Sequence, residues 1–76
     1  MVLDTSAIVA IILQEPGFEQ LIEKIAMART VAVATPTLLE CAIVLTSRLS
    51  LDARIVIHGL VKKMNAQVVP FTEERL

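Results

Sequence analysis

The chain of 76 residues carries seven basic and eight acidic side chains, for a net charge of −1, and 55% of its residues are apolar. A net charge this close to zero gives no general attraction to nucleic acid, and the only aromatic residues, Phe18 and Phe71, are too few for a base-stacking platform. A chain this short forms one domain with a thin stability margin. Its high mean hydropathy of +0.72 therefore predicts apolar surface that is covered by a partner or by the rest of a larger domain.

The sequence also bears on the cellular compartment. The longest uncharged runs, at 5–14 and 30–39, fall short of the ~20 residues that span a bilayer. Asp4 stands where a secretory signal would carry basic residues, and a single cysteine, Cys41, cannot form an internal disulfide. We therefore expect no membrane segment and a cytosolic location.

Strand-like and helix-like segments alternate along the first half of the chain. Residues 1–4 form a short strand candidate. The apolar run at 7–14 is interpreted as a buried helix because Glu15-Pro16-Gly17 follows it with a turn signal. Residues 18–28 carry apolar side chains at i, i+3, i+4 and i+7, which predicts an amphipathic helix.

The second half continues in the same order. Residues 31–34 predict a small buried strand, and Pro36 suits the start of the next helix, which we expect to run to about Arg48. Ser50 is expected to cap a further helix that runs to Met64. The remaining residues predict a third strand at 67–71 and the opening of another helix at 72–74.

Strands separated by helices indicate an α/β fold with a parallel sheet and right-handed crossovers. About three strands and four helices are expected in one domain. Asp4 follows the first strand, and Glu40 lies near the start of the helix after the second strand. Because the carboxyl ends of parallel strands meet at one edge of a sheet, where ligands bind in open α/β folds, the two carboxylates are candidates for one site. Oxygen ligands of this kind suit Mg²⁺ or Mn²⁺.

Structural roles compete with this interpretation. Asp4 could serve only as the cap of the helix behind it, and Thr37-Leu38-Leu39-Glu40 matches a capping box in which Glu40 reaches back to the helix start. Thr5 and Ser6 are better interpreted as helix caps than as nucleophiles, because no base is placed to activate them. Two other polar side chains carry no metal-site pattern, namely Cys41, expected in the core, and His58, on a polar helix face.

Three short motifs together carry a family resemblance. They are MVLDTSA at 1–7, PTLLE at 36–40 and VVPFT at 68–72. In this order and spacing the chain resembles the N-terminal half of a PIN domain, and most closely the VapC-type toxins of bacterial toxin–antitoxin pairs. The resemblance implies a three-layer α/β/α fold, truncated here, in which residues 1–76 form the N-terminal portion and the C-terminal portion is absent. It also implies that the first strand is an exposed sheet edge.

The resemblance further implies Mg²⁺-dependent cleavage of RNA. Asp4 and Glu40 match the family's first two acidic metal ligands, and Thr5 or Ser6 matches a hydroxyl beside the metal-bound water or the phosphate. The expected partners are RNA, a cognate antitoxin and a second copy of the chain.

One departure from the family limits the expected activity. The family places further Asp residues in its C-terminal half, whereas the acids after Glu40 are Asp52, Glu73 and Glu74. Two carboxylates hold Mg²⁺ loosely, so we expect residues 1–76 to cleave RNA weakly or not at all. One alternative is a fragment that acts only by binding its antitoxin or a like subunit. Another is a haloacid-dehalogenase-like phosphotransferase, which would need an Asp at the position of Ser6.

Overall fold

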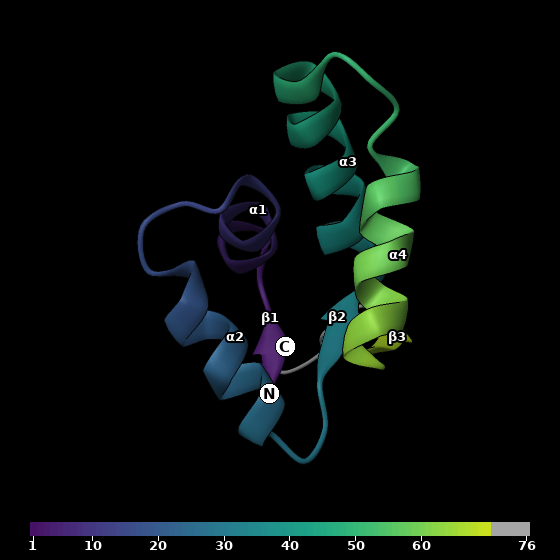
Figure 1. Ribbon diagram of the computed structural model, residues 1–76. Coiled ribbons are helices and arrows are strands. Elements are labelled where there is room, and N and C mark those ends of the chain that lie inside the picture. The colour runs from purple at the N-terminus through teal and green to yellow at the C-terminus, as the bar shows by residue number, and fades with distance from the viewer. Residues whose placement is uncertain (71–76) are drawn as a thin grey trace.

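The computed structural model describes residues 1–70, which form three strands and four helices (Figure 1). In chain order these are β1 (Val2–Leu3), α1 (Thr5–Leu13), α2 (Phe18–Met27), β2 (Ala32–Ala34), α3 (Thr35–Leu49), α4 (Arg54–Met64) and β3 (Gln67–Val69). The predicted fold class, a PIN-like α/β arrangement with a parallel sheet, is confirmed, with three strands and four helices within residues 1–70. The helix predicted at 72–74 and the last residue of the predicted third strand, Phe71, lie outside the described residues.

The three strands form one parallel sheet in the order β1-β2-β3. Val2 of β1 pairs with Ala32 of β2, and Val33 of β2 pairs with Val68 of β3. Each crossover between neighbouring strands contains two helices, and both crossovers step in the same direction along the sheet. Within residues 1–70, β1 has a strand partner on one side only, and Val2 there is 61% exposed, as expected of a sheet edge.

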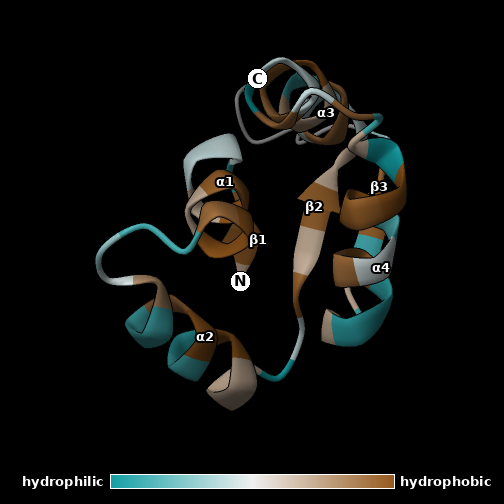
Figure 2. Ribbon diagram, turned by 45° about the horizontal axis from the view of Figure 1, so that its top comes forward, coloured by the Kyte–Doolittle hydropathy of each residue, from teal (hydrophilic) through white to brown (hydrophobic). Residues whose placement is uncertain are grey.

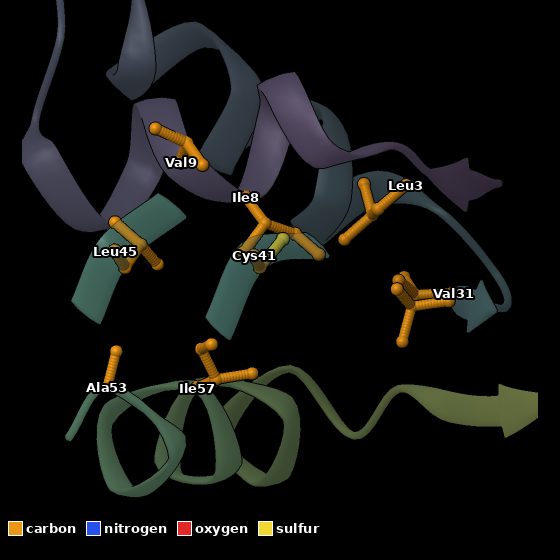
Figure 3. Close-up of a cluster of buried hydrophobic side chains, with 9 residues drawn as sticks. Leu3, Ile8, Val9, Val31, Cys41, Leu45, Ala53 and Ile57 are labelled. Atoms are coloured by element: carbon orange, nitrogen blue, oxygen red, sulfur yellow. The ribbon is translucent and has the colours of Figure 1, made fainter. Parts of the chain in front are cut away.

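One hydrophobic cluster joins the sheet to three of the helices (Figure 3). Leu3 and Val33 contribute from the strands, Ile8 from α1, and Cys41 and Leu45 from α3. Ala53, the N-cap residue of α4, and Ile57 within that helix also belong to the cluster. The fully enclosed residues are central to the stability of the domain, because apolar burial is its main stabilising term. The expectation that Cys41 is a core residue is confirmed, since its side chain is 0% exposed.

Three of the helices end at a residue in the left-handed backbone conformation. Gln14, Ser50 and Asn65 terminate α1, α3 and α4 in the left-handed conformation, which exposes the last carbonyls to capping N–H groups. The expectation that Ser50 caps the following helix is wrong, because Ser50 ends α3 instead and α4 begins only at Arg54. The start of α4 is held by Asp52, whose carboxylate accepts the Arg54 N–H at 3.0 Å and pairs with its guanidinium.

The helices differ in how they meet the core. Figure 2 shows α1 hydrophobic around much of its circumference, whereas α2 and α4 carry hydrophilic residues along one side. No residue of α2 is buried, so this helix lies at the periphery. Within residues 1–70, no helix is both long enough and apolar enough to cross a membrane.

The core assignment can be tested on α3. Leu45 is 0% exposed, so Leu45→Ala should lower the free energy of unfolding by about 2–5 kcal/mol, through lost burial and a residual cavity. Met27 at the end of α2 is 84% exposed, and Met27→Ala should change the free energy of unfolding by no more than about 0.5 kcal/mol. Urea unfolding followed by circular dichroism measures both. Equal losses of unfolding free energy in the two variants would contradict the assignment of Leu45 to the core.

Candidate active site

Asp4 lies between β1 and α1 and caps the helix. Its Oδ1 accepts the N–H of Ala7 at 2.9 Å, while its backbone is extended, as is typical of an N-cap. Asp4 therefore caps α1, as the competing structural interpretation proposed. The cap uses only the Oδ1 atom of the carboxylate, and no donor within residues 1–70 hydrogen-bonds Oδ2. Capping and cation binding by Asp4 are consequently compatible.

Glu40 projects from α3 toward the start of α1. The Thr5 hydroxyl donates to Glu40 Oε1 at 2.8 Å, which joins residues that are 35 positions apart. The capping-box interpretation of Glu40 is wrong, because α3 begins at Thr35 with Ala34 as its N-cap. Thr37 is already inside the helix, and the Glu40 carboxylate bonds a different helix. The Oε2 atom of Glu40 accepts no hydrogen bond from the described part of the chain.

The buried Cys41 thiol is influenced by the charges of both Asp4 and Glu40. Burial raises the pKa of the Cys41 thiol, the nearby Thr5 side chain lowers it, and the negative charges of Glu40 and Asp4 raise it further. Both carboxylates therefore act on the same buried sulfur atom. With its pKa raised, the thiol stays protonated and neutral, so the exposed donors of the cluster are oxygen atoms.

The other candidate residues lie apart from these contacts. Ser6 is exposed in the first turn of α1, and its hydroxyl forms no hydrogen bond with residues 1–70. His58 is exposed on α4. The structure therefore brings together Asp4, Thr5 and Glu40, with Cys41 beneath them. Sequence patterns missed the bond between Thr5 and Glu40 and the proximity of Cys41. The only signal for Cys41 was its position next to Glu40 in the chain.

The donor set fits a hard divalent cation. Mg²⁺ is commonly held by one or two carboxylates, with water and substrate phosphate completing its ligands. Asp4 and Glu40 each offer one carboxylate oxygen that accepts no hydrogen bond from residues 1–70. The amino end of α1, which Asp4 caps, adds positive potential that favours anions. Within residues 1–70 no three His, Cys, Asp or Glu side chains form a metal-binding group, so these two carboxylates are the available protein ligands.

A separate apolar groove lies at the opposite edge of the sheet. It has a volume of about 590 Å³ and includes Val31, next to the start of β2, and Gln67, the first residue of β3. Its apolar lining comprises Ile11, Ile22, Ile25, Val31, Leu60 and Met64. The cationic side chains of Arg29 and Lys63 also line it, and no acidic residue in the described part of the chain does. The groove is therefore distinct from the carboxylate cluster.

A family profile described as the PIN domain matches residues 1–76. This chain belongs to the PIN domain family. PIN domains have a nuclease-like fold and are in general dependent on divalent metal ions, in agreement with the oxygen ligands of Asp4 and Glu40. No curated protein and no solved structure matches the chain.

In this PIN domain, two substitutions distinguish the helix-capping role of Asp4 from the role of its negative charge. Asp4→Ala removes the acceptor of the Ala7 N–H and should lower the free energy of unfolding by about 1 kcal/mol. Asp4→Asn keeps a side-chain oxygen at the N-cap and should remain close to the wild type. Urea unfolding of the three proteins makes the comparison. Equal stability of Asp4→Ala and wild type would show that the cap contributes nothing.

Proposed function

We propose that this PIN domain is a metal-dependent endoribonuclease of the VapC toxin type, acting in the cytosol, with Asp4 and Glu40 as ligands of Mg²⁺ or Mn²⁺. The observation that carries the proposal is the 2.8 Å hydrogen bond from Thr5, the residue after Asp4, to Glu40, which brings the helix that Asp4 caps next to the Glu40 carboxylate. Each carboxylate is hydrogen-bonded through one oxygen and has the other oxygen available to a cation. The nuclease-like fold of the family supports the same conclusion.

The residues of the chain have distinct tasks in this proposal. A bound Mg²⁺ would polarise the scissile phosphate and generate hydroxide near neutral pH. Asp4 and Glu40 hold the cation, and the amino end of α1 attracts the phosphate oxygens. Ser6 is exposed in the first turn of α1, and we assign its hydroxyl to contact with the RNA.

Cleavage by this chain should be slow. Within residues 1–70 the cluster offers two carboxylates, which hold Mg²⁺ loosely and leave the position of the cation poorly fixed. Asp52 does not add to them, because its carboxylate is engaged by Arg54, which lowers the pKa of Asp52 to about 2. A slow nuclease therefore has to be distinguished from a chain that acts only by binding.

The apolar groove supports an antitoxin as the binding partner. Its lining is apolar, and the charged side chains that join it, Arg29 and Lys63, are both cationic. An amphipathic helix with acidic residues beside its apolar face would complement such a groove. Because the groove lies away from Asp4 and Glu40, binding there is separable from catalysis.

A second surface supports self-association. Leu39 and Ile43 on α3 are 62% and 72% exposed, and Ile55 at the start of α4 is 78% exposed. Asp52 and Arg54, next to Ile43 in a shallow hollow, offer charges of both signs. A two-fold related copy could pair with both charges while covering the apolar side chains. We therefore propose this surface as the contact of a homodimer.

The nuclease proposal predicts a charge-dependent loss of cleavage. Asp4→Asn should abolish the Mg²⁺-dependent cutting of a single-stranded RNA, because it removes one of two anionic ligands while keeping the helix cap. Cleavage is measured over hours with labelled RNA, with and without EDTA. Glu19→Gln, which neutralises an exposed carboxylate on α2 away from the cluster and from both proposed partner surfaces, is the control and should cut like wild type. Cutting that persists in Asp4→Asn, or in EDTA, would contradict the site.

The partner proposals predict separable effects on assembly. Ile22→Glu places a charge in the groove and should weaken binding of a cognate antitoxin at least tenfold, without changing the oligomeric state of the protein alone. Ile43→Glu should convert a dimer to a monomer and leave antitoxin binding intact. Light scattering coupled to size-exclusion chromatography measures the mass of the protein alone and of its complex with the antitoxin. A monomeric wild type would rule out the dimer, and unchanged antitoxin binding by Ile22→Glu would rule out the groove. Antitoxin binding by a wild type that does not cleave RNA would favour a binding-only role.

A further inference from the structure

We infer that Thr5 is a positioning residue of the metal site, which orients Glu40 and does not itself contact the cation, its water or the phosphate. The inference rests on the proposed metal-binding role of Asp4 and Glu40. It departs from the role that the family resemblance implies for Thr5, in which the hydroxyl lies beside the metal-bound water or the phosphate.

The hydroxyl chemistry of Thr5 carries the first step. A carboxylate only accepts hydrogen bonds, so the 2.8 Å contact between Thr5 Oγ1 and Glu40 Oε1 uses the one proton of the hydroxyl. Thr5 then has no proton to donate to a phosphate oxygen. Ser6, whose hydroxyl is exposed and forms no hydrogen bond with residues 1–70, keeps that capacity.

The two carboxylates are held in the same manner. Asp4 is fixed through Oδ1 by the N–H of Ala7, and Glu40 is fixed through Oε1 by the hydroxyl of Thr5. Within the described residues the second oxygen of each group accepts no hydrogen bond. Each carboxylate is therefore positioned by one oxygen and presents the other one to a cation, as ligands held by neighbouring hydrogen bonds do in metal sites.

The position of Thr5 makes it effective in this role. It is the first residue of α1, directly after Asp4, and it is half-buried, so its side chain is fixed by the start of the helix. Glu40 is exposed and has a long side chain that would otherwise sample several rotamers. The bond from Thr5 restricts those rotamers and keeps Glu40 on the same side as Asp4.

Mn²⁺ binding to the complete chain tests the inference without relying on cleavage. Electron paramagnetic resonance measures the free Mn²⁺ during a titration of wild type, Thr5→Val, Thr5→Ser and Thr37→Val. Thr5→Val keeps the shape of the side chain and removes the donor, so the dissociation constant should rise about 10- to 100-fold. Thr5→Ser restores the donor and should bind within about twofold of wild type. Thr37→Val, a matched change inside α3, should bind like wild type.

The outcomes separate this inference from the nuclease proposal. If wild type binds Mn²⁺ and Asp4→Asn does not, while Thr5→Val binds as wild type, the inference is overturned and the metal site stands. Loss of affinity in Thr5→Ser as well as in Thr5→Val would also overturn it, because the hydroxyl would not be the cause. If wild type itself shows no saturable binding that Asp4→Asn removes, both fail. Should Thr5→Val lose its circular dichroism spectrum, Thr5→Ala provides the donor-free comparison under the same criteria.

Discussion

The hydrogen bond between Thr5 and Glu40 is the contact on which the site depends. It joins the first residue of α1 to α3, the opening helices of the two crossovers. Both helices begin at the same edge because β1 and β2 are adjacent and parallel. Leu3, Ile8 and Cys41 belong to one buried cluster (Figure 3). The two helices that carry Thr5 and Glu40 are therefore held by a close-packed core.

The order of elements could be predicted because it depends on local chemistry. The turn at Pro16 and Gly17 separates α1 from α2, and Gly17 adopts the positive φ that glycine accepts most readily. Pro36 lies in the first turn of α3, where its missing N–H is tolerated. The placement of Asp4 directly after β1 follows from the same alternation. The family resemblance agreed with this order, and the profile match established the family.

Contacts between distant residues could not be predicted from these patterns. The capping-box spacing of Thr37 and Glu40 is local, but the carboxylate bonds Thr5, because α3 begins three residues earlier than the pattern requires. Ser50 fits a cap by residue type, yet it ends α3 because the chain needs a left-handed residue there. Asp4 was treated as either a cap or a ligand, although its two oxygens allow both roles. For Glu40 and Ser50 the outcome depends on where α3 starts and ends, which single residue types do not fix.

The two edges of the sheet have different characters. The carboxyl edge carries the Asp4 and Glu40 carboxylates, whereas the groove at the other edge is apolar and cationic. The proposed metal site and the proposed partner site are therefore at different edges.

The most direct test of the metal site is the anomalous diffraction of a crystal grown with Mn²⁺, which locates the bound ion. We predict a peak in contact with Asp4 Oδ2 and Glu40 Oε2, with the Thr5 hydroxyl still on Oε1. A peak that contacts neither carboxylate, or one bound through Oε1 with Thr5 displaced, would contradict the proposed site.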